Sequence, residues 1–256
     1  MSLATMSIFA VILLASGAPI PLGPPTGDVE DRTWLEVEWA VERAGHIEGD
    51  NVSPEGRSLQ VNAITIKQLL WPGATIPYMI SPELKNQYEL IRKAMDSIEN
   101  VTCVRFVERT NEKDYIRIFS GRGCYAGVGH QHGVQPVSLG HGCLYLSTIE
   151  HELLHAVGFF HEQMRPDRDQ YITIITENID PKYVSQFQKL HPGPNDNFVP
   201  FDTDSVMLYG GHAFARQQGL TTMTAKDGTV LIPLYNKTGL SDTDILSVNI
   251  LYNCPN

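Results

Sequence analysis

Several histidines surround a glutamate in this sequence, and together they could hold a metal ion that assists hydrolysis. His151 and His155 are four residues apart, and on a helix two such side chains project from the same face. Gly158 is expected to end that helix, so that the chain turns back and brings His161 to the same point. Three imidazoles with an open fourth position are typical of a catalytic zinc site, since structural zinc sites are closed by a fourth protein ligand. Glu152 lies beside His151 and can act as a general base toward a water at the open position.

A second motif separates this interpretation from its simplest alternative, two surface histidines on an amphipathic helix. The segment Ser205-Val206-Met207-Leu208-Tyr209 follows the histidines by some forty residues. The extended histidine motif followed by a methionine turn is the signature of metzincin-type hydrolytic zinc sites. We therefore expect Met207 beneath the metal and Tyr209 next to it.

The start of the chain of 256 residues is typical of an exported protein. Residues 8–15 form an apolar run that is too short to span a bilayer and is followed by small residues, which favours a secretory signal over residues 1–17. The alternative is a buried strand or helix. No other stretch is apolar enough to cross a membrane, so we expect a soluble, secreted, extracellular protein that does not act at a membrane. Candidate N-glycosylation sites are Asn100 and Asn236, while the sequon at Asn51 is weakened by the proline after it.

Residues 18–61 differ in composition from the rest. They are rich in proline and hold nine acidic and three basic residues, so they carry six of the ten net negative charges. Such a stretch is expected to be extended, with little core of its own. The chain lacks the basic excess of a nucleic-acid-binding protein, which excludes that class.

From Asn62 onward the pattern predicts an α+β domain. Alternating apolar residues predict strands at 103–107 and 115–119, and we expect further strands at 75–80, after a Pro-Gly turn, and at 137–146. The predicted helices are one that Ser81 caps and that runs through residue 98, the helix with the histidines, and a last helix at 242–251. After His161 the chain is richer in Pro, Gly and Asn. A sheet-and-helix half followed by an irregular half predicts an active-site cleft between them, with the metal on its floor.

Four cysteines suit an oxidising compartment. Cys103, Cys124, Cys143 and Cys254 allow three pairings, and their spacing does not choose among them. Cys124 with Cys143 would close a short loop, and Cys103 with Cys254 would then tie the end of the chain to an early strand.

Three other histidines, His130, His132 and His141, lie close together in the sequence. Either they are ordinary loop residues or they belong to a second metal site. We interpret them as loop residues.

The sequence resembles the astacin family of zinc endopeptidases from Asn62 to Cys254, about three quarters of the chain. Glu162, directly after the third histidine, distinguishes astacins from other metzincins. The segments that carry the resemblance are HELLHAVGFFHE (151–162), RPDRDQY (165–171) and SVMLY (205–209), with LWP (70–72), IPY (76–78) and GRGCY (121–125). Leu208 departs from the family, which usually has a histidine there.

The resemblance implies an astacin-like fold: a twisted mixed sheet with two long helices, an irregular second subdomain and a cleft between them. It implies one Zn²⁺ per subunit, bound by His151, His155 and His161. Tyr209 would be a displaceable fifth ligand that later donates a hydrogen bond to the oxyanion, and Met207 a hydrophobic base. The implied disulfides are Cys103–Cys254 and Cys124–Cys143. The strand near Cys124-Tyr125-Ala126 would hold an extended peptide.

The resemblance also implies a zymogen, with a signal peptide at 1–17, an inhibitory propeptide at 18–61 and a catalytic domain at 62–256. Asp50, in Ile47-Glu48-Gly49-Asp50, would take the water's place on the zinc. Glu162 would pair with the freed terminus at Asn62. A cut after Val61 is a poor trypsin-like site, whereas Arg57 offers one, so trimming would follow a first cut.

We therefore expect a secreted zinc endopeptidase that hydrolyses extracellular proteins by a zinc-bound water, with Glu152 as the general base. Its partners would be extended protein or peptide substrates, its own propeptide and an activating protease, and we expect a monomer. The alternatives are a catalytically inert secreted binding module on the same fold, or a zinc hydrolase of non-peptide bonds. The retained histidines, Glu152 and Tyr209 argue against the former, and the match to a protease family against the latter.

Overall fold

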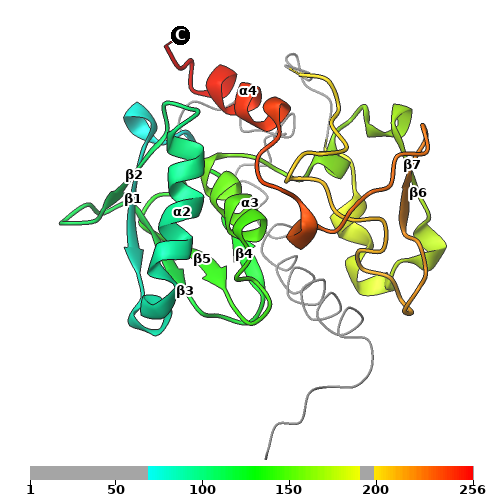
Figure 1. The fold of residues 1–256 in the computed structure, drawn as a ribbon, viewed down its shortest axis with the longest axis horizontal. Coiled ribbons are helices and arrows are strands. Elements are labelled where there is room, and N and C mark those ends of the chain that lie inside the picture. Colours follow the sequence, from blue (N-terminus) through cyan, green and yellow to red (C-terminus); the bar gives the residue numbers. More distant parts are fainter. Residues whose placement is uncertain (1–68, 191–198, 256) are drawn as a thin grey trace, which may run out of the picture.

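A computed structural model describes residues 69–190 and 199–255 of the chain. The predicted signal peptide, the propeptide with Asp50, and Asn62 lie outside the described residues, so these assignments stay predictions. Within the described residues, a sheet-and-helix half (cyan to green in Figure 1) is followed by a half with little regular structure. The order of the two halves is the one that the sequence predicts.

The first half is built on a five-stranded mixed sheet. Its strands are β1 (Thr75–Ile80), β2 (Arg105–Glu108), β3 (Tyr115–Phe119), β4 (Cys124–Ala126) and β5 (Val134–Leu139). The order is β2-β1-β3-β5-β4, and all neighbours are parallel except β4, which runs antiparallel to β5 at one edge. In β3, Ile116 and Ile118 are fully buried while the residues between and beside them are more exposed, so the strand has one core face.

Two helices of twelve residues, α2 (Tyr88–Glu99) and α3 (Leu146–Val157), pack against each other and on the sheet (Figure 1). The predicted start of the first helix is wrong in part. Residues Pro82–Gln87 form a 3₁₀ helix, and α2 begins only after Gln87, whose backbone is not helical. The Ser81 side chain makes no capping bond and instead accepts one from Arg117 Nε at 3.1 Å.

The strand predicted at 137–146 is also wrong in its extent, because β5 ends at Leu139. A side chain at Gly140 would lie 2.4 Å from the carbonyl oxygen of Gly121, so only glycine allows this approach. Gly142 has a positive φ of 85°, which turns the chain. Leu146 is therefore the first residue of α3 and not the end of a strand.

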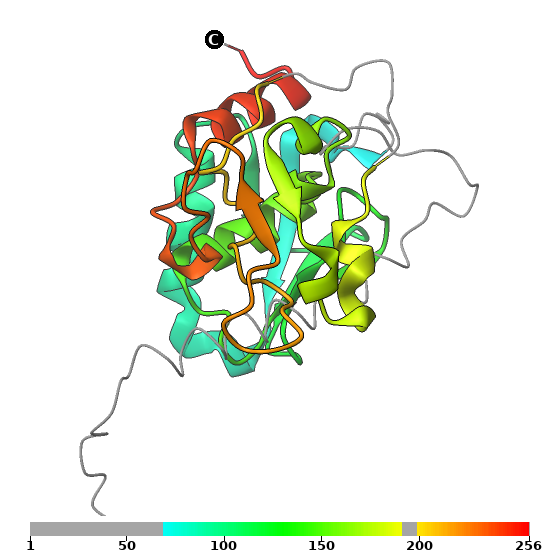
Figure 2. The ribbon, with the colours of Figure 1, turned by 90° about the vertical axis from the view of Figure 1, so that its right-hand side faces the viewer.

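The second half contains a two-stranded antiparallel sheet, β6 (Ile172–Ile174) with β7 (Met223–Ala225), which the sequence does not predict; Figure 2 shows the pair side by side. Helix α4 (Asp242–Leu251) has the predicted bounds and starts with a capping box between Ser241 and Asp244. The remaining elements are short 3₁₀ helices at Pro72–Ala74, Glu162–Met164, Arg168–Gln170, Thr176–Asn178, Pro181–Phe187 and Leu234–Asn236.

Both halves contribute to one hydrophobic core, which includes Ile116 and Leu153 from the first half and Phe214 and Val248 from the second. A shared, close-packed core fixes the position of one half against the other. The methionine turn is therefore held in a defined place relative to α3.

Two disulfides close the fold, Cys103–Cys254 and Cys124–Cys143. This pairing is the one that the family resemblance implies. Both candidate glycosylation sites, Asn100 and Asn236, are exposed, and their occupancy stays a prediction. None of the helices in the described part of the chain has the length and apolar character needed to cross a membrane.

Candidate metal centre

Helix α3 carries His151, Glu152 and His155, and every residue from Ser147 to Val157 is buried. A helix that is buried on all sides is expected to be apolar throughout, because an ionisable side chain in the interior is costly unless it has partners. The helix ends at Gly158, with φ 135°, a conformation that glycine adopts readily. The N–H groups of Gly158 and Phe159 both donate to the Leu154 carbonyl at 3.0 Å. The chain reverses here, as predicted, and returns His161 to the helix.

The three histidines meet at their Nε2 atoms. The Nε2–Nε2 distances are 3.0 Å between His155 and His151, 3.2 Å between His151 and His161, and 3.2 Å between His155 and His161. Tetrahedral ligands 2.0–2.1 Å from zinc are separated by roughly 3.3 Å. The three nitrogens are therefore spaced as ligands of one ion.

The other ring nitrogens show which tautomer two of these histidines adopt. His151 Nδ1 donates to the Val206 carbonyl at 2.7 Å, and His155 Nδ1 donates to the Phe159 carbonyl at 2.6 Å. A carbonyl can only accept, so Nδ1 carries a proton, and in the neutral imidazole Nε2 then carries a lone pair. Lone pairs that converge in a buried place repel one another unless a cation lies between them. The donor set therefore fits Zn²⁺, with each ring oriented by a backbone carbonyl.

The other predicted site residues lie around this point. Glu152 is buried in the same turn of α3 as His151. Tyr209 is buried, and its ring centroid lies 4.2 Å from that of His161 and 6.4 Å from that of His151. Met207 is buried, and its carbonyl accepts a hydrogen bond from Glu162 N at 2.8 Å. The structure thus brings the two predicted motifs together at one place.

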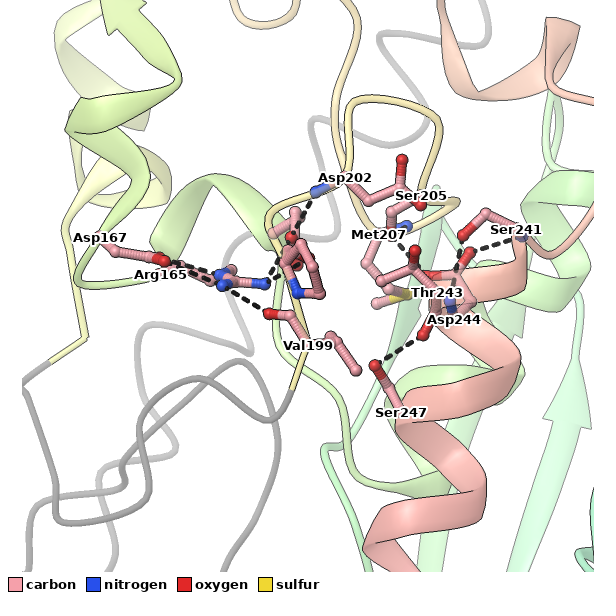
Figure 3. A network of polar contacts seen from close by, with 12 residues as sticks. Arg165, Asp167, Val199, Asp202, Ser205, Met207, Ser241, Thr243, Asp244 and Ser247 are labelled. Carbon is pink, nitrogen blue, oxygen red and sulfur yellow. Dashed lines mark hydrogen bonds and ion pairs between the residues drawn. The ribbon is translucent and has the colours of Figure 1, made fainter.

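Asp244, on α4, is joined to the methionine turn by hydrogen bonds (Figure 3). Its Oδ1 accepts from Ser205 Oγ at 2.6 Å, and its Oδ2 accepts from Val206 N at 3.0 Å. Ser205 Oγ in turn accepts from Met207 N at 3.0 Å. Burial raises the pKa of the Asp244 carboxyl, and these hydrogen bonds oppose the rise. Sequence reasoning missed this residue; its only signal is the Ser-Asp-Thr-Asp start of α4, which predicts a capped helix and no more.

Lys237 is a second missed residue of the same region. It is buried, and its ammonium donates to the carbonyls of Ser205 and Thr203. Desolvation lowers the pKa of Lys237 to about 8, although the neighbouring acids, Asp244 first, oppose the fall. In the sequence it is only the middle residue of a glycosylation sequon.

The segment after His161 is stabilised by ion pairs. Arg165 is fully buried and makes two bonds of 2.9 Å to the Asp167 carboxylate, one of 2.9 Å to Glu162 and one of 3.1 Å to the Val199 carbonyl (Figure 3). Burial raises the pKa of Glu162 to about 7, and the charge of Arg165 opposes the rise. The partner predicted for Glu162, the terminus at Asn62, lies outside the described residues.

Comparisons with known proteins agree with this geometry. The family model for astacin, a family of peptidases, matches residues 63–253. "Astacin-like metalloprotease toxin 1" of Loxosceles intermedia is 42% identical over 214 residues, which cover 82% of this chain and 81% of the relative. "High choriolytic enzyme 1" of Oryzias latipes is 40% identical over 217 residues, or 81% and 78% of the two chains.

A solved structure shares the fold. The hatching enzyme zinc-protease of the medaka Oryzias latipes superimposes with a TM-score of 0.69 at 38% identity, covering 76% of this chain and all of that one. Family model, relatives, fold and histidine triad therefore point to one conclusion. The chain belongs to the astacin family and is a zinc-dependent metalloendopeptidase.

Proposed function

We propose that this protein is exported as a zymogen and cleaves peptide bonds in extracellular proteins, with Glu152 as its general base and Tyr209 as its oxyanion donor. The observation that carries the proposal is the convergence of three Nε2 atoms within 3.2 Å while Nδ1 of His151 and of His155 donates to a carbonyl. Export is supported by the apolar run at residues 8–15 and by two disulfides.

The site residues divide the chemistry among them. Zinc, when bound, lowers the pKa of a water to about 7 and polarises the substrate carbonyl. Glu152 accepts the proton of the attacking water at its carboxylate and passes it to the leaving amine. Tyr209 donates its hydroxyl proton in a hydrogen bond to the oxygen that becomes negative as the water attacks. The carbonyls of Val206 and Phe159 keep the rings of His151 and His155 in the required orientation.

An extended substrate suits the edge of the sheet. Among the described residues β4 pairs with β5 alone, so its other side can accept a peptide strand by backbone hydrogen bonds. The Cys124–Cys143 disulfide joins β4 to the chain before α3, which carries two of the ligands. A peptide added to β4 would therefore lie in a fixed position relative to the metal. We infer that the substrates are protein segments that can adopt an extended conformation.

The zymogen part of the proposal depends on residues 18–61. Asp50 is proposed to hold the position of the attacking water until the segment is removed. Glu162 is proposed to pair with the new terminus at Asn62. The buried carboxylate of Glu162, already beside Arg165 and within one residue of His161, supports this second role.

The experiment compares two glutamates of α3 in the activated enzyme. Glu152→Gln is expected to lower casein cleavage by several orders of magnitude while the zinc at the histidine triad is retained. Glu150→Gln is the matched control, because Glu150 is equally buried but accepts from Ser97 Oγ at 2.6 Å on the side of α2. The control should cleave casein as the wild type does, and 1,10-phenanthroline should abolish the cleavage by both. A wild-type chain that binds zinc without cleaving any protein would instead support the inert binding module.

A further inference from the structure

A second group of side chains that could ligate a metal ion lies apart from the triad of His151, His155 and His161 in the described part of the chain. His130 Nε2 is 2.9 Å from Asp114 Oδ2, and His132 Nδ1 is 3.3 Å from the same oxygen. One ligand atom from each of the three residues lies within 4.8 Å of the others. From the sequence alone we interpret the two histidines as loop residues. They do lie on the loop between β4 and β5. The Asp114 side chain, which precedes β3, lies against both of them, so the three residues form one cluster.

The sheet explains why residues so far apart in the sequence meet. β3 and β5 are parallel neighbours that start at the same edge, with Tyr115 opposite Val134. Asp114 immediately precedes β3, and Gly133 immediately precedes β5. Tyr115 N donates to the Gly133 carbonyl at 3.0 Å. The sheet register therefore sets the separation of the carboxylate from the loop.

Backbone groups of the loop hold the candidate ligand atoms in place. The Gly133 N–H donates to Asp114 Oδ1 at 2.7 Å, which leaves Oδ2 facing the two imidazoles. The same bond is the largest of several that lower the pKa of the Asp114 carboxyl to about 2, so it is charged at neutral pH. His132 has a positive φ of 61°, which is uncommon outside glycine. This backbone conformation places the His132 ring 4.3 Å from the His130 ring.

The cluster has one buried side and one open side. His130 is only 4% exposed and lies 4.5 Å from the Trp71 ring, centroid to centroid. The His132 side chain is 66% exposed and that of Asp114 is 37% exposed. A surface pocket of about 370 Å³, lined in part by Asp114, His130 and Trp71, lies beside them. An ion can therefore reach the ligand atoms from solvent, and water can complete its coordination.

Two imidazoles and a carboxylate are a donor set for a divalent transition metal. We propose that Asp114, His130 and His132 form an accessory site for such an ion, with Cu²⁺ held more tightly than Zn²⁺.

Hydrogen bonds connect the accessory site to the C-terminal end of α3. Gly129 N, at the start of the same loop, donates to the His155 carbonyl at 2.8 Å, and Trp71 Nε1 donates to the Ala156 carbonyl at 2.8 Å. An ion in the accessory site thus fixes the loop that holds the end of α3.

The test measures metal content of the full chain after equilibrium dialysis against Zn²⁺ or Cu²⁺ and removal of free metal. The wild type is expected to hold one more ion per chain than His132→Asn and than Asp114→Asn. Asparagine tolerates a positive φ, so the first variant keeps the loop conformation. In the second, the amide oxygen can still accept from Gly133 N. The difference of one ion does not depend on what the catalytic triad binds, so it tests the accessory site separately from the function proposed above.

His212→Asn is the matched control, because His212 is an exposed histidine elsewhere in the described chain. It should bind as many ions as the wild type. The extra ion should also raise the melting temperature of the wild type and of the control, and leave that of His132→Asn unchanged. Equal metal content in the wild type, His132→Asn and Asp114→Asn would overturn the proposal. Loss of one ion from His212→Asn as well would show surface binding without a built site and would overturn it too.

Discussion

Nδ1 of His151 lies 2.7 Å from the carbonyl oxygen of Val206, the residue immediately before Met207. The hydrogen bond joins the first histidine of the triad to the methionine turn. It connects two residues that are 55 positions apart in the sequence, one in each motif, and it assigns the turn a role beyond packing. The position of the Val206 carbonyl sets the direction in which His151 Nε2 points. Residues that hold Val206 therefore influence the metal site without touching it.

Asp244→Asn tests this connection. The carboxylate accepts from Ser205 Oγ on one oxygen and from Val206 N and Ser241 N on the other. An amide of the same shape keeps one acceptor and replaces the other with a donor. We expect zinc affinity to fall by about 10- to 100-fold, as for other residues that orient metal ligands. Competition with a chromogenic chelator measures the affinity.

The control for this prediction is Asp242→Asn, which alters an exposed carboxylate in the same turn of α4. It should leave zinc affinity unchanged. If Asp244 only caps α4, its substitution will lower the unfolding free energy but not the zinc affinity. That result would contradict the connection from Asp244 to His151.

Tyr209→Phe tests the proposed oxyanion donor. The ring contacts of Tyr209 with His161 and Phe214, at 4.2 and 5.1 Å between centroids, do not need the hydroxyl. We therefore expect normal folding, a full zinc content and a KM within a few-fold of the wild type. Loss of one oxyanion donor should lower kcat by about 10²- to 10³-fold.

Steady-state kinetics on a quenched fluorescent peptide measure both constants. Tyr183→Phe is the control, since this tyrosine also packs on Phe214, at 5.1 Å, but has no proposed role in catalysis. A kcat of Tyr209→Phe equal to that of the control would exclude a role for the hydroxyl in the reaction.

The sequence predicts best what depends on local patterns. β1, β3 and α4 have the predicted bounds, because β1 follows a Pro-Gly turn, the apolar residues of β3 alternate, and Ser241 caps the start of α4. The triad is predicted because all three histidines belong to one motif of eleven residues. The predicted start of α2 and the predicted end of β5 are wrong, because non-helical backbone at Gln87 and the close approach at Gly140 overrode the apolar pattern.

Residues that act across the fold could not be found in this way. Asp244 meets Val206 from 38 residues away, and Lys237 meets Ser205 from 32 residues away. Asp114 meets His130 only because β3 and β5 are neighbours in the sheet. Each of these contacts requires the tertiary structure, and none leaves a spacing in the sequence.

Asp50→Ala tests the proposed zymogen contact. Without the carboxylate, water is expected to reach the triad in the intact precursor. We therefore expect the unprocessed variant to cleave a short peptide, while the wild-type precursor stays silent. Gel analysis after the assay must show that the precursor is still intact. Glu48→Ala, two residues away in the same segment, is the control and should stay silent.

Lys237 should give the folded protein an unusual dependence on pH. Its pKa is lowered by burial to about 8 from an ordinary value of 10.5, so between these values the unfolded chain binds more protons than the folded one. Stability then rises as the pH rises through this window, and is flat for this group on either side. A shift of this size corresponds to a rise of up to about 3 kcal/mol in the free energy of unfolding. Urea unfolding at a series of pH values from 7 to 11 measures the rise. A difference of ~1 kcal/mol in the free energy of unfolding is the smallest that such extrapolations resolve.

Lys237→Met removes the titrating group, so the variant is expected to lack that rise. Its stability at neutral pH should also fall, because the carbonyls of Ser205 and Thr203 lose their donor and the negative charge of Asp244 loses a positive neighbour. Lys182→Met, at an exposed lysine, is the control and should follow the wild type across the whole range. If wild type and Lys237→Met show parallel pH profiles, the lysine is not held in a desolvated place behind the methionine turn. A rise in the stability of the wild type alone would show that a buried ammonium group, whose pKa is lowered by folding, lies against the methionine turn.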